Sequence, residues 1–362
     1  MPTRSDILAR AARLRVVFEA AGSQIVDPPL LQSAETLLDL YGEDIRARAY
    51  VTSDALRGEQ MLRPDFTLPV VQMHMQEGAE PARYTYSGEV FRRQEFDDTR
   101  PNEYVQVGYE IFEREDPAAA DAEVFALMQL QLKGLPVRAA TGDMGILMAA
   151  VQGLKTTDRR KAALMRHIWR PRRFRALLDR FAGRTAVPPT REALLSTEGD
   201  ITGSVPEIGK RSRAEIDNRI DALRADAAEP PLAENQLLAL EALLAVRETL
   251  PFALEQMRDI AVDLPQMLPA LDALDARAAA LKARGVDVDH LDFEATYGRT
   301  SMEYYDGFVF GFYAEARPDL PPVASGGRYD ALTRMLGQGA EIPAVGGVIR
   351  PDLMLELEEA KA

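Results

Sequence analysis

The chain has 362 residues, three histidines and no cysteine, and its formal net charge is −14. Such a length allows one large domain or two. Without cysteine there is no disulfide, thiolate metal site or thiol nucleophile. His74, His167 and His290 are too scattered to form a spaced set of metal ligands, so we expect neither a metal nor another cofactor. The acidic balance also opposes extended binding to a nucleic-acid backbone.

The sequence predicts a cytoplasmic protein that does not contact a membrane. No run of about 18 apolar residues, the length that crosses a bilayer, is present. The N-terminus, with Arg4, Asp6 and Arg10, does not have the pattern of a signal peptide.

The first predicted elements are two helices joined by an extended segment. Apolar residues recur at helical spacing from Ser5 to Ala21, with Ser5 as the expected N-cap and Gly22 as the stop. Residues 24–31 contain two prolines and should be extended, and a second helix is predicted over residues 33–40.

An antiparallel hairpin is expected next. Residues 84–91 and 104–112 are rich in aromatic and β-branched residues, and a polar loop over residues 97–103 separates them. Residues two apart on a strand point to the same side, so Gln106 and Glu110 should share one face of the second strand.

The remainder alternates between helix and strand patterns. A helix is predicted over residues 121–134, and residues 145–285 consist mostly of helix formers interrupted by proline pairs. Strand patterns return over residues 304–313 and 344–349, with a short helix over residues 331–336 between them.

These elements predict an α+β fold, an antiparallel sheet flanked by helices with a helical insertion subdomain. Residues 1–144 form the first part of the core in this interpretation. Residues 145–285 form the insertion, and residues 286–362 form the second part of the core.

Two segments carry residue types that could bind a polar ligand. The turn over residues 62–67 presents Asp65 and Thr67 to a common point, although a carboxylate beside a proline turn is more often a helix cap. On the hairpin, Arg92, Gln106 and Glu110 could hold the polar groups of an amino acid, but an exposed polar sheet face is also ordinary.

Three further segments leave alternatives open. Tyr304 and Tyr305 could line a pocket or pack in the core. Glycine pairs at residues 326–327 and 346–347 permit close approach to a ligand or form bulges, and their spacing fits no dinucleotide or phosphate-loop motif. The arginine-rich run over residues 166–175 could bind a partner or nucleic acid, but its arginines fall around the helix, which favours a solvated face.

Taken in order, these segments resemble the catalytic core of class II histidyl-tRNA synthetases over nearly the whole chain. Residues 62–67 resemble the family's Leu-Arg-Pro-Glu-Gly-Thr turn, with Asp for Glu and Phe for Gly. In the second motif, Arg92 matches the motif arginine and Arg100 the loop arginine, and residues 326–330 match the Gly-Gly-Arg-Tyr-Asp sequence before the third motif. Residues 28–29 and the helix after them resemble the first motif, which implies a self-dimer.

The resemblance also implies an amino-acid pocket. Its residues are those that match the family's histidine site, namely Asp65, Thr67, Arg92, Gln106, Glu110, Tyr304 and Tyr305.

Three positions depart from the synthetase pattern. Thr300 replaces the arginine that activates the carboxylate, with Arg299 one place out of register and so expected on the opposite face of a strand. Leu353 replaces the arginine that holds ATP, and Gln94 replaces a metal-coordinating glutamate. Loss of one electrostatic donor can lower an enzyme's rate by about 10²–10³-fold, so we expect no adenylation and no catalytic residue here.

The chain ends soon after the third motif, whereas synthetases continue into an anticodon-binding domain, so we expect no such domain and no binding of tRNA. These features resemble the regulatory subunits of short-form ATP phosphoribosyltransferase, the first enzyme of histidine biosynthesis. That resemblance implies a non-catalytic subunit that forms a hetero-oligomer with catalytic subunits and takes part in feedback control by L-histidine. Two alternatives stay open, an active histidyl-tRNA synthetase-type enzyme and a stand-alone histidine-binding protein.

Overall fold

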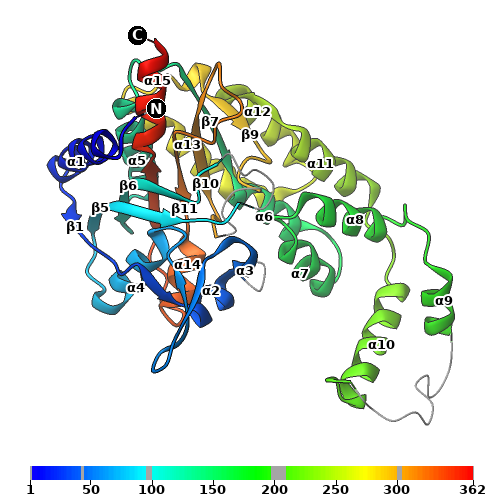
Figure 1. The fold of residues 1–362 in the computed structure, drawn as a ribbon. Coiled ribbons are helices and arrows are strands. Elements are labelled where there is room, and N and C mark those ends of the chain that lie inside the picture. Colours follow the sequence, from blue (N-terminus) through cyan, green and yellow to red (C-terminus); the bar gives the residue numbers. More distant parts are fainter. Residues whose placement is uncertain (1, 42–44, 95–99, 197–208, 300–303, 362) are drawn as a thin grey trace.

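The computed structural model describes residues 2–41, 45–94, 100–196, 209–299 and 304–361. Its centre is a nine-stranded sheet (Figure 1). The strands follow one another across the sheet in the order β1 (Gln24–Ile25), β5 (Ala82–Phe91), β6 (Glu103–Phe112), β12 (Ala344–Ile349), β11 (Ala324–Arg328), β10 (Phe308–Ala314), β7 (Val137–Asp143), β9 (Asp292–Glu294) and β8 (Arg247–Thr249).

Most neighbouring strands run antiparallel, which confirms the predicted α+β fold. The parallel exceptions are β1 beside β5 and β7 beside β9. The predicted hairpin is β5 and β6, and Gly88 faces Gln106 in its register. The sheet core is aromatic, since Phe125 lies 5.4 Å from Phe310 and 5.1 Å from Phe312 between ring centroids.

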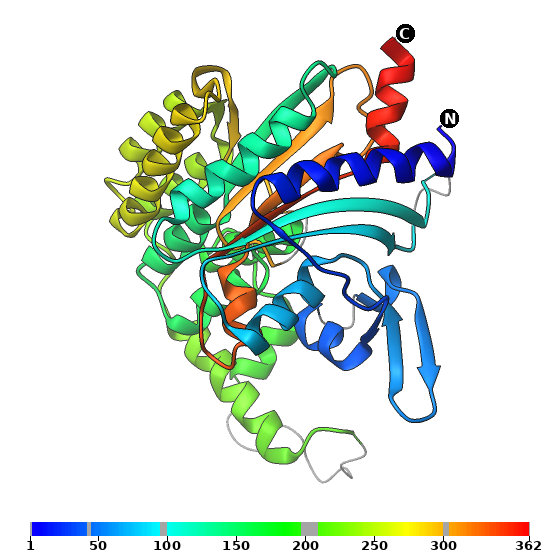
Figure 2. The same ribbon diagram turned by 90° about the vertical axis from the view of Figure 1, so that its left-hand side faces the viewer.

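A second, three-stranded sheet precedes the hairpin in the chain. It has the order β2 (Leu31–Ser33), β4 (Gly58–Leu62) and β3 (Val51–Asp54). With α2 (Ala34–Tyr41), α3 (Ile45–Arg48) and α4 (Thr67–Glu77), it lies on the side of β5 and β6 away from α1 (Figure 2).

Helices cover the other face of the sheet. α1 (Arg4–Ala20) lies along β5 and β6, while α5 (Pro117–Gln131) lies across β6, β12 and β11 (Figure 2). α15 (Pro351–Lys361) packs beside α1, and α14 (Asp330–Leu336) packs against α4.

Two predicted boundaries are wrong for local reasons. The N-cap of α1 is Thr3 and not Ser5, because Thr3 and Asp6 form a reciprocal capping box. Strand β10 begins at Phe308, so Tyr304 and Tyr305 lie in the turn before it and not on the strand.

Most of the predicted insertion is helical. Its helices are α6 (Met144–Gly153), α7 (Asp158–Arg166), α8 (Pro171–Phe181), α9 (Pro189–Ser196), α10 (Arg213–Ala228), α11 (Glu234–Ala245), α12 (Leu250–Ile260) and α13 (Leu268–Ala283), with short 3₁₀ turns at Pro265–Met267 and Val288–His290.

The parts of this helical segment differ in their packing against the sheet. β8 pairs with β9 at the sheet edge, and α13 packs on α5. α9 and α10 instead extend away from the sheet (Figure 1). The division at residues 145 and 285 stays a prediction. No helix among the described residues meets the length and apolarity that a membrane span needs.

Candidate functional site

Six of the seven predicted site residues line one cavity of about 850 Å³. They come from the turn before α4, the end of β5, the middle of β6 and the turn before β10, and they are Asp65, Thr67, Arg92, Gln106, Tyr304 and Tyr305. Residues far apart in the sequence therefore meet at one polar site.

Asp65 is both a helix-capping residue and a residue of the cavity lining. Its Oδ1 accepts a hydrogen bond from the backbone N–H of Leu68 at 3.2 Å, so the carboxylate caps the start of α4. The same buried carboxylate lines the cavity. Thr67, the first residue of α4, also lines the cavity.

Glu110, the seventh residue, is fully buried and is not among the residues that line the cavity. Three hydroxyl groups donate to its carboxylate: Thr67 at 3.0 Å, Tyr86 at 2.7 Å and Tyr329 at 2.6 Å. Burial raises the pKa of Glu110 to about 7, although these three hydrogen bonds oppose the shift. Thr67 therefore connects the buried Glu110 carboxylate to the cavity lining.

A glycine on the neighbouring strand makes room for this carboxylate. Gly346 of β12 faces Glu110 of β6, and a methyl group at residue 346 would overlap Glu110 Oε2. The glycine pair at residues 346–347 is thus explained by close approach of a buried side chain.

Gln106 and Arg92 are held differently at the cavity wall. Gln106 Oε1 is buried and finds no hydrogen-bond partner among the described residues. Arg92 Nε donates to the backbone carbonyl of Pro64 at 2.8 Å, which fixes the guanidinium beside the turn that carries Asp65. A buried acceptor without a partner is costly, so Gln106 is suited to receive a donor from a ligand.

Tyr304 and Tyr305 form an aromatic wall. Their ring centroids lie 4.8 Å apart in an edge-to-face arrangement, and Tyr304 lies 6.1 Å from Tyr329. Burial raises the pKa of Tyr305 well above its ordinary value, so its hydroxyl stays protonated. Such a wall can hold a flat ring by stacking and by its hydroxyl groups.

Arg299 also lines the cavity, which the sequence pattern did not predict. The expectation that the one-residue shift would turn it away is wrong, because Arg299 lies in a turn and not on a strand. Its Nε donates to the carbonyl of Ile168 at 2.7 Å, and its guanidinium lies 4.7 Å from the Phe174 ring. Nη2 is buried without a partner among the described residues, and burial lowers the pKa of Arg299 to about 10.

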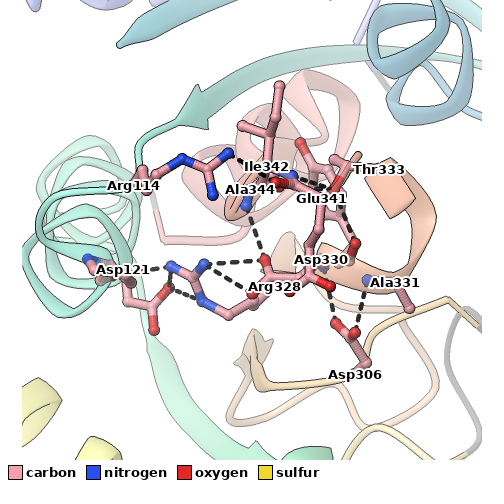
Figure 3. Close-up of polar contacts among 12 residues, drawn as sticks. Arg114, Asp121, Asp306, Arg328, Asp330, Ala331, Thr333, Glu341, Ile342 and Ala344 are labelled. Carbon is pink, nitrogen blue, oxygen red and sulfur yellow. Dashed lines mark hydrogen bonds and ion pairs between the residues drawn. The ribbon is translucent and has the colours of Figure 1, made fainter. Parts of the chain in front are cut away.

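A buried polar network joins α5, the end of β11 and the start of α14 to the turn before β10 (Figure 3). Arg328 donates to Asp121 of α5 at 2.6 Å and to Asp330 at 3.0 Å. Asp306 accepts from the backbone N–H groups of Asp330 at 2.9 Å and Ala331 at 2.7 Å. The Gly-Gly-Arg-Tyr-Asp segment is thereby tied to the turn that carries the two tyrosines.

The same network includes α13. Arg277 of α13 donates to Asp121 of α5 at 2.8 Å and to Asp143 at the end of β7 at 2.7 Å. Burial raises the pKa of Asp306 to about 7, with a further contribution from the nearby Asp330 carboxylate.

The positions that depart from the synthetase pattern offer little positive charge. Leu353 is buried in α15, and Arg350, three residues earlier in the chain, pairs with Asp352 at 2.7 Å. Gln94 is half-buried and donates to the carbonyl of Pro101 at 3.4 Å. Thr300 lies outside the described residues.

The loop arginine of the second motif and a metal site are the next features to locate in the described part of the chain. Arg100 donates to the carbonyl of Asp319 and is not among the residues that line the cavity. No cluster of three or more His, Asp or Glu side chains that could hold a metal ion occurs among the described residues.

The fold and a family-model match define a histidyl-tRNA synthetase-like protein. The family model described as histidyl-tRNA synthetase matches residues 3–218 and 212–353. The fold resembles that of a histidyl-tRNA synthetase from Nostoc sp. PCC 7120, with a TM-score of 0.64, 16% identity, and coverage of 98% of this chain and 72% of that one. A structure titled as an ATP phosphoribosyltransferase regulatory subunit/histidyl-tRNA synthetase from Bacillus halodurans C has a TM-score of 0.68 at 22% identity, over 98% of this chain and 79% of that one.

Sequence relatives narrow this class. An ATP phosphoribosyltransferase regulatory subunit of Agrobacterium fabrum is 34% identical, over 94% of both chains. The protein of the same name from Mesorhizobium japonicum is 32% identical, over 97% of this chain and 98% of the relative. The chain belongs to the family of ATP phosphoribosyltransferase regulatory subunits.

Proposed function

We propose that this chain is a non-catalytic regulatory subunit that acts in the cytoplasm on a separate ATP phosphoribosyltransferase catalytic subunit, with L-histidine as its effector. The single observation that carries the proposal is the cavity, which gathers six of the seven residues predicted for an amino-acid pocket. The burial of Leu353 at the position of the ATP-holding arginine supports the absence of adenylation.

The chemistry of the cavity suits each part of histidine. Asp65 offers a carboxylate to the ammonium group, and the tyrosine pair offers a wall for the imidazole. Arg299 offers a buried guanidinium to the carboxylate, which compensates for the family arginine that Thr300 replaces. Gln106 Oε1 adds an acceptor for a ligand N–H.

A self-dimer through the synthetase-like core belongs to the same proposal. Leu8 and Val16 of α1, Ile25 of β1, and Leu30 and Leu31 after it are exposed apolar side chains. A partner surface that covers them would bury this apolar area, which favours association.

Titration calorimetry with L-histidine tests the pocket. We expect Gln106→Ala and Arg299→Gln each to weaken binding at least tenfold, because each removes one polar partner of the ligand. The control Arg13→Gln, an exposed substitution on α1, should leave the affinity unchanged. Equal affinities in all four proteins would contradict the histidine site.

Assays with the short-form catalytic subunit from the same organism test the regulatory role. We expect this chain to raise the phosphoribosyltransferase activity and histidine to lower it, with a coupling of about 1–3 kcal/mol. Absence of activation would overturn the regulatory proposal. Histidine-dependent pyrophosphate exchange into ATP by this chain alone would instead favour the synthetase alternative.

A further inference from the structure

A second cavity, separate from the amino-acid pocket, is lined by an unusual concentration of arginines. It has a volume of about 330 Å³ and lies among α7, α8, α9 and α10. Its arginines are Arg159, Arg160, Arg166, Arg180, Arg191 and Arg219. Asp226 is the only acidic residue in its lining as far as the described residues define it, and no lining residue is shared with the amino-acid pocket.

The single carboxylate is already shared by three of the arginines. Asp226 accepts from Arg160 Nε at 2.8 Å, and its Oδ2 lies 3.3 Å from Arg180 Nη2 and 3.5 Å from Arg191 Nη2. Arg160 also donates to the backbone carbonyls of Pro230, Asp226 and Glu229, so it serves to join α7 to the end of α10.

The other three arginines add positive charge that no described side chain pairs with. Arg159, Arg166 and Arg219 form no hydrogen bond or ion pair with any described residue. Their side chains border the cavity while their residues remain exposed, which leaves the guanidinium groups accessible to a ligand.

The pKa values of Arg180 and His167 are lowered, as expected beside an excess of positive charge. Burial, together with repulsion from Arg191, Arg160 and Arg219, lowers the pKa of Arg180 despite the nearby Asp226. Burial and repulsion from Arg170, Arg173 and Arg166 likewise lower the pKa of His167, which also lines the cavity. An anion in this cavity would relieve the repulsion among the guanidinium groups.

We propose that this cavity binds the phosphate groups of a small phosphorylated compound. Guanidinium groups pair with phosphate oxygens through two parallel hydrogen bonds, and several of them converge here. The volume suits a diphosphate or the phosphate end of a nucleotide and is too small for a nucleic-acid duplex. The net charge of −14 also opposes binding to a long polyanion.

Apolar side chains complete the lining. The guanidinium carbons of Arg160 and Arg180 lie 5.1 Å and 4.6 Å from the centroid of the Phe181 ring, and Leu177 and Leu223 lie beside it. This packing holds the two guanidinium planes in place before a ligand arrives. The site does not depend on the proposed regulatory function or on the histidine pocket.

Titration calorimetry of the full chain with inorganic pyrophosphate tests this site, with ATP as a second probe. We expect one pyrophosphate per chain, and an affinity at least tenfold weaker in the double variant Arg159→Gln/Arg219→Gln. The matched control Arg13→Gln/Arg172→Gln removes the same charge from exposed positions outside the cavity and should change the affinity less than twofold. Arg166→Gln alone provides an independent single-site variant.

Three results would overturn the proposal. One is the absence of pyrophosphate binding at millimolar concentration. Another is an equal loss of affinity in the cavity variant and the control variant, which would show a diffuse charge effect. The third is binding of a single-stranded RNA oligonucleotide without binding of pyrophosphate or ATP, which would assign the arginines to nucleic acid.

Discussion

Glu110 is a carboxylate at the centre of the fold that is satisfied by hydroxyl groups and not by a cation. Tyr86, Tyr329 and Thr67 donate to it, and it is fully buried. A buried ionised carboxylate without a cation is costly, so the group takes up a proton near neutral pH. This explains why the pKa of Glu110 rises to about 7.

The stability of the protein should therefore fall as the pH rises from about 4.5 to about 7. In this window the unfolded chain has lost the proton of Glu110 while the folded chain retains it, so each rise in pH favours unfolding. A shift from 4.5 to about 7 corresponds to roughly 3 kcal/mol. Glu110→Gln should reduce this slope in urea unfolding at several pH values.

Asp306 contributes a slope of the same sign, because burial also raises its pKa to about 7, so Glu110→Gln should remove only part of the dependence. The control Glu255→Gln changes an exposed carboxylate on α12 and should leave the slope intact. An unchanged slope in Glu110→Gln would show that Glu110 does not titrate in this range.

The resemblance to histidyl-tRNA synthetases named six of the residues that line the cavity. The local patterns alone left Asp65 open as a helix cap and Gln106 open as part of an ordinary polar sheet face. The sequence did not predict that Arg299 lines the cavity. The orientation of its side chain depends on contacts with Ile168 and Phe174, which lie more than a hundred positions away in the chain.

At the scale of elements, the approach of β12 to β6 depends on Gly346. A methyl group there would overlap Glu110 Oε2 and force the carboxylate away from Tyr329. We expect Gly346→Ala to lower the free energy of unfolding by about 1–3 kcal/mol, as overpacking does in other cores. The control Gly209→Ala meets nothing closer than 4.0 Å and should change stability by less than about 0.5 kcal/mol. Comparable values for the two variants in urea unfolding would refute this role of Gly346.

Three elements meet at Asp121, because this one carboxylate of α5 binds Arg277 of α13 and Arg328 of β11. Asp121→Asn should lower the free energy of unfolding by about 3–5 kcal/mol, since it leaves two buried guanidinium groups with too little negative charge. Asp292→Asn breaks the exposed pair with Arg138 and should cost less than about 1 kcal/mol. Thermal or urea unfolding of both variants measures the two losses of stability. A loss below about 1 kcal/mol for Asp121→Asn would show that its ion pairs with Arg277 and Arg328 contribute little to stability.

The elements differ in how well sequence patterns revealed them. β5, β6 and β12 are long or clearly bounded, and their alternation and glycine content predicted them. β8 was hidden inside a run of helix formers, because a three-residue edge strand owes its existence to pairing with β9 and not to local propensity.

At the scale of the molecule, the helical segment is not a uniform body. α13 packs on α5 beside the sheet, whereas α9 has no buried residue and α10 buries only Ile220. Sequence composition could not separate these two parts, since both are rich in helix formers and only tertiary packing distinguishes them.

This contrast predicts a gradient of local stability. Backbone amides of α10 should exchange with solvent roughly 100-fold faster than those of β6, because few apolar contacts oppose the opening of α10 while β6 is buried along most of its length. Hydrogen exchange followed by mass spectrometry measures both segments in one experiment.

Substitution of Asp226 tests whether its ion pair holds α10 in place. It pairs with Arg160 of α7 with both side chains largely buried, so Asp226→Asn should speed exchange in α10 further. Exchange in β6 should stay the same, because no contact of Asp226 reaches the sheet among the described residues. Equal protection of α10 and β6 in the unmodified protein would contradict this gradient. It would mean that α10 opens only when the whole molecule unfolds.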